Sequence, residues 1–105
     1  QANKNVKNLP GQNLLILGGS ELIYPLSGKT PPEIYIPPLP WYFAVSEYQN
    51  QFLSSLAKTK TPILYYPSAS VDNQPITAYT DFLIKILETN YNKEVHENYY
   101  LYLPK

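Results

Sequence analysis

The sequence lacks cysteine, methionine and arginine, and it contains a single histidine, His96. Without cysteine, the chain cannot form a disulfide, a thiolate metal site or a cysteine nucleophile. One histidine also excludes a metal site built from several imidazoles. These absences leave the cellular compartment open.

Net charge and long apolar runs are absent as well. The formal net charge is zero and the eight lysines are scattered, whereas nucleic-acid surfaces and polybasic membrane patches need clustered cations. No apolar stretch approaches the roughly 20 residues that span a bilayer, and no signal-peptide pattern opens the chain. We therefore expect no nucleic-acid partner.

The length of 105 residues is enough for one domain with a buried core. Eleven tyrosines and eleven prolines, together with blocks of aliphatic residues, indicate a folded domain with stiff loops rather than a disordered chain. The chain begins at Gln1 without a methionine. We therefore expect residues 1–105 to be a single soluble domain cut from a larger multi-span membrane protein.

Apolar blocks of two kinds alternate along the chain. Short continuous runs, typical of buried strands, cover residues 13–17, 33–36 and 63–66. Helical spacing is found in residues 22–26, 46–57 and 76–89, and the alternating tail predicts a hairpin of residues 91–95 and 99–103. Val6 lies in a short helix or an ordered lead-in, and residues 67–75 are expected to form a polar loop. This order predicts an α/β fold, a small layered domain with a mostly parallel sheet, helices packed on it and a C-terminal β-hairpin.

Two of the expected helices begin with capping signals. Ser20 is the expected N-cap of the first, and Ser46 with Gln49 forms a capping-box pair at the second. The first helix is expected to end at Gly28, which favours a left-handed conformation. Its expected apolar face comprises Leu22, Ile23, Tyr24 and Leu26.

The stretch GGSE at residues 18–21 raises the question of whether Ser20 is a nucleophile. A serine nucleophile needs a base, and the base needs an orienting group. His96 is the only imidazole. SGNH-type hydrolases have an aspartate three residues before that histidine, where this chain has Lys93, although Glu94 and Glu97 are available to orient the ring. We favour helix capping for Ser20 and keep an SGNH-like hydrolase as an alternative.

Phosphate-binding and carboxylate-pair motifs are weak. No complete glycine-rich phosphate motif occurs, because Gly28-Lys29-Thr30 lacks the upstream glycine. The pairs Glu33 with Glu47 and Asp72 with Asp81 are interpreted as surface carboxylates rather than a glycosidase site.

The segment PPLPWYF, residues 37–43, combines stiff backbone with three adjacent aromatic rings. Trp41 and Tyr42 are suited to a membrane interface or a partner surface, because such rings have an apolar body and a polar tip. The alternative places the rings in the core, which we favour for Phe43 and leave open for Trp41. The segment lies between regular elements, which disfavours a free SH3 ligand.

The chain resembles the C-terminal soluble domain of bacterial GT-C membrane glycosyltransferases, the group of the protein O-mannosyltransferases and the lipid A aminoarabinose transferase. The resemblance lies in three stretches, LLILGGSELIYPLSGKTPP, LAKTKTPILYYP and LIKILETNYNKEVHENYYLYLPK. Within the first, residues 23–32 correspond to the family pattern "iYfLsgr-pp". The resemblance covers nearly the whole chain.

The resemblance implies a non-catalytic extracytoplasmic domain of a polyprenyl-phosphate-sugar-dependent glycosyltransferase that shapes acceptor or donor access. It implies a place on the outer side of a bacterial membrane, anchored through the parent protein. The implied partners are the membrane portion of the parent chain, the polyprenyl-phosphate sugar donor and the acceptor. Because the family's catalytic acid lies in an early loop outside this chain, no catalytic residue, cofactor or metal site is implied here.

Two loops, residues 24–32 and 39–43, are expected to lie on one side of the domain and to face the parent's membrane portion. The candidates for a substrate- or membrane-facing role are Tyr24, Ser27, Lys29, Trp41 and Tyr42. The alternative to the glycosyltransferase hypothesis is a free-standing SGNH-like hydrolase or a small binding module.

Overall fold

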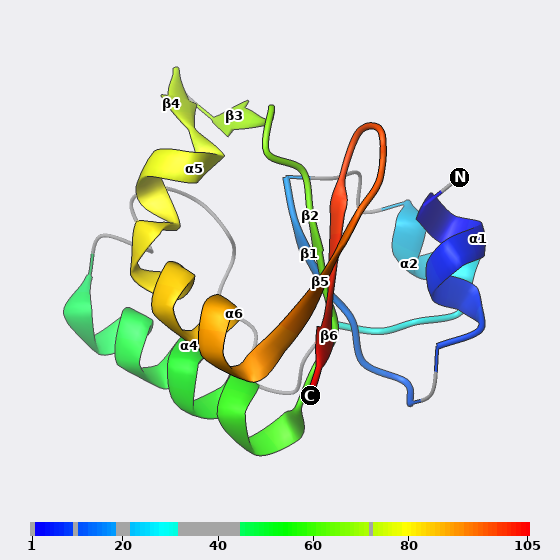
Figure 1. The fold of residues 1–105 in the computed structure, drawn as a ribbon, viewed down its shortest axis with the longest axis horizontal. Coiled ribbons are helices and arrows are strands. Elements are labelled where there is room, and N and C mark those ends of the chain that lie inside the picture. The colour runs from blue at the N-terminus through cyan, green and yellow to red at the C-terminus, as the bar shows by residue number, and fades with distance from the viewer. Residues whose placement is uncertain (1, 10, 19–21, 32–44, 72) are drawn as a thin grey trace.

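The computed structural model describes residues 2–9, 11–18, 22–31, 45–71 and 73–105, and its elements form a layered α/β domain (Figure 1). The expected strand at 33–36, the aromatic segment 37–43 and Ser20 lie outside these residues. The prediction that Ser20 caps the first helix was wrong, because that helix begins at Ile23 and its N-cap is Leu22, without a side-chain capping bond. The predicted α/β class, with helices packed on a sheet and a hairpin at the C-terminal end, is confirmed.

The main sheet has four strands in the order β1-β2-β6-β5. β1 (Leu15–Leu17) and β2 (Ile63–Tyr65) are parallel, whereas β2 with β6 (Tyr100–Pro104) and β6 with β5 (Tyr91–Val95) are antiparallel. The expectation of a mostly parallel sheet was therefore wrong for the described strands. The hairpin docks through β6 beside β2 in the centre of the sheet, so it contributes two antiparallel pairs instead of an antiparallel edge.

Helices cover both faces of the sheet (Figure 1). On one side lie α4 (Ser46–Thr59), α5 (Ile76–Tyr79) and α6 (Ile84–Asn90), and on the other lie α1 (Ala2–Lys7) and α2 (Ile23–Ser27). The core is accordingly double. One cluster joins Leu15, Leu17, Ile63 and Tyr65 to Phe52 and Leu87, and the other joins Ile16, Leu64 and Leu101 to Val6 and Ile23. Successive residues of β1 and β2 face opposite layers, which is why both sequences are continuously apolar.

The helices differ from the expectation in where they start and break. α4 begins at Ser46, but its N-cap is Val45 without a side-chain capping bond, so the capping box is one residue out of place. The single helix expected over 76–89 is α5, a 3-10 turn at Asp81–Leu83 and α6. The break falls at Thr80, whose hydroxyl donates to the carbonyl oxygen of Ile76 at 2.5 Å and competes with the helical backbone bonds.

Two further segments complete the chain. Val6 lies in a helix, α1, and is fully buried. The expected loop at 67–75 contains a small ladder of β3 (Ser70–Val71) and β4 (Gln74–Pro75). In the described part of the chain, no helix has the length and apolar character needed to cross a membrane.

Candidate functional site

The segment that follows α2 returns the chain to the free side of β1. Gly28 ends α2 in the left-handed conformation expected of it, with a φ of 75°. Thr30 then exchanges backbone bonds of 2.9 Å with Gln12 and Leu14, just before β1 begins. The segment therefore extends the sheet at the edge formed by β1.

Tyr24 and Ser27 turn their hydroxyl groups toward this segment. The phenol oxygen of Tyr24 accepts the backbone N–H of Ile16 at 3.3 Å. Ser27 is 4% exposed, and its hydroxyl donates to the carbonyl oxygen of Tyr24 and accepts the N–H of Lys29. Both side chains thus stabilise the connection between α2 and β1.

Lys29 has its ammonium group inside the domain. The residue is 7% exposed, and Nζ donates to the carbonyl oxygens of Leu9 and Gly11 at 2.5 and 2.6 Å. An ammonium group is a donor without acceptor capacity, so two carbonyls are suitable partners for it at low exposure. Lys29 therefore fixes the turn after α1.

The five predicted candidates divide into two groups. Tyr24, Ser27 and Lys29 are brought together around the end of α2, whereas Trp41 and Tyr42 lie outside the described residues. A substrate- or membrane-facing role for these five residues stays a prediction, as does the placement of the loops 24–32 and 39–43 on one side.

Leu22, the N-cap of α2, and Leu26, within α2, are exposed to solvent. Both were expected on the apolar face that packs against the domain. Leu22 is 68% exposed and Leu26 is 62% exposed, while Ile23 and Ser27 are buried. Residues four apart share one face of a helix, so Leu22 and Leu26 lie together, beside the face of the buried pair. The sequence prediction placed Leu22 and Leu26 on one apolar face with Ile23 and Tyr24, and it did not show which side of so short a helix packs on the sheet.

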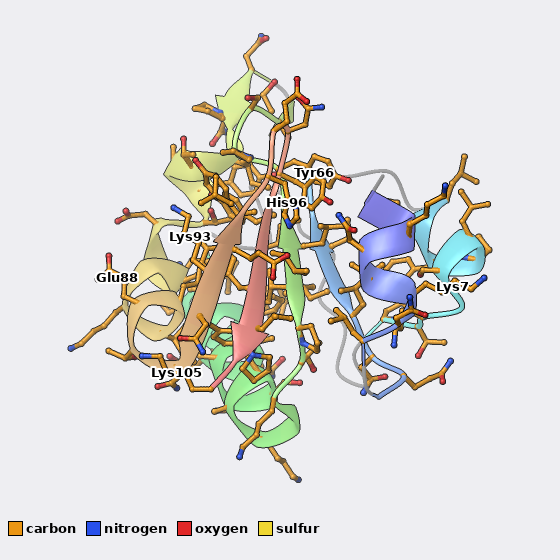
Figure 2. All side chains as sticks on the ribbon, turned by 45° about the vertical axis from the view of Figure 1, so that its right-hand side comes forward. Lys7, Tyr66, Glu88, Lys93, His96 and Lys105 are labelled. Atoms are coloured by element: carbon orange, nitrogen blue, oxygen red, sulfur yellow. The ribbon has the colours of Figure 1, made fainter. Side chains whose placement is uncertain are left out.

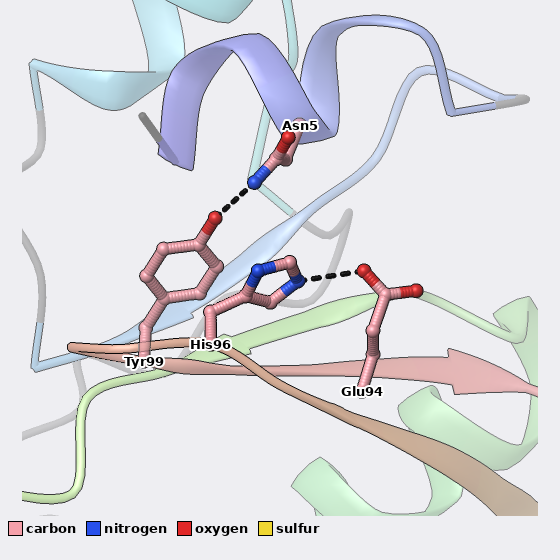
Figure 3. Close-up of polar contacts among 4 residues, drawn as sticks. All are labelled: Asn5, Glu94, His96 and Tyr99. Atoms are coloured by element: carbon pink, nitrogen blue, oxygen red, sulfur yellow. Dashed lines mark hydrogen bonds and ion pairs between the residues drawn. The ribbon is translucent and has the colours of Figure 1, made fainter.

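A second group of polar side chains lies at the hairpin turn (Figure 3). Nε2 of His96 lies 2.6 Å from a carboxylate oxygen of Glu94. The imidazole stacks on the ring of Tyr99, with centroids 4.6 Å apart, and the phenol of Tyr99 accepts a hydrogen bond from the amide nitrogen of Asn5 in α1. The hairpin is thereby joined to the α1 layer.

This cluster lies at the end of the sheet where β2 finishes. Tyr66 directly follows β2, and its ring packs against Tyr99 with a centroid distance of 5.8 Å. Figure 2 shows Tyr66 and His96 at the same end of the sheet. Burial, with a smaller contribution from Tyr99, raises the pKa of the Tyr66 phenol.

The histidine has the orienting partner that general-base chemistry requires. Because a carboxylate only accepts hydrogen bonds, an N–H at Nε2 of His96 is the donor to Glu94. The side chains of His96 and Glu94 are 28% and 51% exposed. No serine or threonine hydroxyl of the described segments is hydrogen-bonded to His96, and Ser20 lies outside them.

Cavities in the described part of the chain include two that involve α6 and a third, of about 400 Å³, along α4. One, of about 210 Å³, lies between the ends of α4 and α6 and is lined by Leu56, Lys60, Asn90 and Lys105. The other, of about 370 Å³, lies between α6 and β5, and Figure 2 shows Glu88 and Lys93 on that side. The ammonium of Lys93 lies 4.0 Å from the ring centre of Tyr100. Within the described ranges, no three histidine or acidic side chains converge as a metal site would need.

Comparison of the chain with protein-family models, with curated proteins and with solved structures finds no match in any of the three.

Proposed function

We propose that this chain is a non-catalytic extracytoplasmic domain of a polyprenyl-phosphate-sugar-dependent membrane glycosyltransferase, in which it shapes acceptor or donor access. Its partners are then the membrane portion of its own parent chain, the sugar donor and the acceptor. Its location is the outer side of a bacterial membrane.

The proposal is supported by the structural role of residues 23–30, which belong to the first of the three stretches that carry the resemblance. Within Ile23–Thr30, the side chains of Tyr24, Ser27 and Lys29 bond to the backbone of β1, α2 and the turn after α1. Side chains that bond to the domain's own backbone stabilise its fold, and they are not positioned to act on a substrate. This role suits an accessory domain whose transfer reaction takes place elsewhere in the parent protein.

The proposal is tested first on the gene. A reading frame that continues upstream into many apolar helices supports it, and a frame that starts immediately before residue 1 overturns it. The full-length protein is then assayed in membranes for sugar transfer from a polyprenyl-phosphate donor. Deleting residues 1–105 is expected to reduce transfer, and the isolated domain is expected to transfer nothing.

A second candidate function, an SGNH-like hydrolase, is favoured by one observation. The carboxylate of Glu94 orients the imidazole of His96 at 2.6 Å, near the end of β2. The test incubates the domain with nitrophenyl esters. Turnover abolished by both Ser20→Ala and His96→Ala would establish the hydrolase, whereas a rate equal to that of buffer would exclude it for these substrates.

A further inference from the structure

The helices α1 and α2 pack beside each other as the outer layer on one face of the sheet (Figure 1). The inner side of each helix packs on the core of the domain. Val6 and Ile23 are buried in the same core cluster, and Asn5 bonds to Tyr99. Because the two helices contact each other, their exposed residues are neighbours on this layer, and we define the α1–α2 face by Lys4, Lys7, Leu22, Pro25 and Leu26.

The apolar part of the α1–α2 face is contributed by α2. Leu22 and Leu26 are the two most exposed large apolar side chains on this layer, at 68% and 62%. Pro25, between them on the same side of the helix, is also exposed. A pair of adjacent leucines with this exposure is a surface that gains free energy when it leaves water.

The charged part of the α1–α2 face is contributed by α1. Lys4 and Lys7 are both exposed and lie three residues apart, so they share the helix side opposite Asn5 and Val6. Figure 2 shows Lys7 beside α2, at the outer side of the layer. Neither helix contains a carboxylate within its bounds, and Glu21 lies outside the described residues. The face therefore combines apolar side chains with positive charge.

We propose that the α1–α2 face docks onto the surface of an anionic lipid bilayer. Leu22 and Leu26 enter the boundary between headgroups and acyl chains, while Lys4 and Lys7 remain at the level of the anionic headgroups. Their long apolar stems and charged tips allow that position. Each lysine gains electrostatic attraction from an anionic leaflet, and the two apolar residues add the second signal that stable surface binding requires.

The same charges disfavour a second copy of the chain as the occupant. A symmetric contact through this face would bring Lys4 and Lys7 of one copy against the same lysines of the other, and like charges repel. A lipid surface supplies the complementary charge instead. The inference does not depend on the glycosyltransferase proposal, because peripheral docking requires neither a sugar donor nor a parent protein.

The test measures how strongly the 105-residue chain partitions onto two kinds of vesicle. One is phosphatidylcholine alone, and the other contains about 30% phosphatidylglycerol, which gives its surface a negative charge. We expect at least about tenfold stronger partitioning onto the anionic vesicles, weakened as salt rises. Leu22→Gln with Leu26→Gln is expected to lower it about tenfold or more on both vesicle types. Lys4→Gln with Lys7→Gln is expected to remove the preference for the anionic vesicles.

Matched variants control for surface charge and exposed apolar residues elsewhere. Lys58→Gln with Lys85→Gln removes the same charge from α4 and α6, and Val95→Gln changes a β5 side chain that is 67% exposed. These variants are expected to partition like the original chain, and circular dichroism melts check that all variants fold. Partitioning that is absent in the original chain, or that the controls reduce equally, overturns the proposal. Self-association removed by the leucine substitutions, without vesicle binding, would assign the face to a second copy and also overturn it.

Discussion

The ammonium nitrogen of Lys29 lies 2.5 Å from the carbonyl oxygen of Leu9 and ties the segment after α2 to the end of the α1 layer. A second bond, of 2.6 Å, reaches the carbonyl oxygen of Gly11. Both partners are backbone carbonyl oxygens in the turn after α1. Because no strand of the described residues pairs with this turn there, the ammonium group of Lys29 acts as their hydrogen-bond donor. Lys29 therefore adds to the contacts of Val6 and Asn5 that hold the α1 layer on the sheet.

Replacement of Lys29 is expected to destabilise the domain. Lys29→Met keeps the length of the side-chain stem and removes both charge-assisted bonds, each of which contributes about 1.5–3 kcal/mol. Water can bond to the carbonyl oxygens of the exposed turn and so offsets part of this loss. We expect the free energy of unfolding to fall by about 2 kcal/mol. Urea unfolding followed by circular dichroism measures the change. Lys85→Met, an exposed lysine on α6, is expected to change the free energy of unfolding by less than about 0.5 kcal/mol. Equal losses in the two variants would contradict the structural role of Lys29.

Two glycines with similar φ angles are expected to respond differently to alanine. Gly18 has a φ of 86°, and a Cβ there would lie 2.6 Å from Cβ of Ala69, whereas Gly28 has a φ of 75° with no atom within 4 Å of a Cβ. Gly28→Ala therefore incurs only the left-handed penalty of about 1–2 kcal/mol. Gly18→Ala adds an overlap that typically costs about 1–3 kcal/mol more. The free energies of unfolding of the two variants give the comparison, and equal values would contradict the close packing at Gly18.

The parts of the fold that were predictable from the sequence are those specified by local patterns. Alternation around the turn placed β5 at Tyr91–Val95 as expected, and β6 at Tyr100–Pro104 lies one residue from its expected position. The continuous apolar run also located β1. Strand pairing is not local, so the antiparallel docking of β6 beside β2 left no signature in either segment.

The candidate site was harder to predict for the same reason. Lys29 bonds to carbonyls 18 and 20 residues earlier in the chain, and no short motif encodes such a contact. The exposed side of α2 depends on which face meets the sheet, and both faces carry apolar residues. The break at Thr80 arises because one hydroxyl competes with helical bonding, which a hydrophobic stripe does not reveal.

The hydroxyl of Thr80 also organises the packing of β2 on α5. It donates to the carbonyl oxygen of Ile76 and lies 2.9 Å from the phenol oxygen of Tyr65, and in this second bond either oxygen can be the donor. Thr80→Val keeps the shape and removes the hydroxyl that also stabilises an ionised Tyr65, so we expect a loss of about 1–3 kcal/mol. Burial already raises the pKa of Tyr65 and the bond to Thr80 lowers it, so the variant is expected to raise that pKa further.

The measurement for Thr80 combines urea unfolding with the ultraviolet titration of tyrosine. Thr89→Val is the matched control, because Thr89 also donates to a backbone carbonyl, that of Lys85, but at the surface. It is expected to change the free energy of unfolding by less than about 0.5 kcal/mol. A tyrosine titration left unchanged by Thr80→Val would argue against the bond to Tyr65.

Tyr91 is expected to make the stability of the domain fall at high pH. Its phenol donates to the carbonyl oxygen of Thr61 at 2.7 Å, and burial raises its pKa from 10.0 to about 12. Between these two values the unfolded chain has released a proton that the folded chain retains. The free energy of unfolding therefore decreases as pH rises through this window, by up to about 1.4 kcal/mol per pH unit from this group.

Tyr91→Phe isolates that contribution from the other tyrosines. Below pH 10 the variant is expected to be about 1–3 kcal/mol less stable, because the carbonyl of Thr61 loses its donor. As the pH approaches 12, ionisation weakens only the original chain, so the difference between the two proteins is expected to shrink. Urea unfolding at pH 8, 10 and 11.5, a range taken to span the titration, measures it. Tyr100→Phe, at a half-buried position on β6, controls for the loss of a phenol. A Tyr91→Phe difference that stays constant with pH would show that the phenol titrates alike in the folded and unfolded chains.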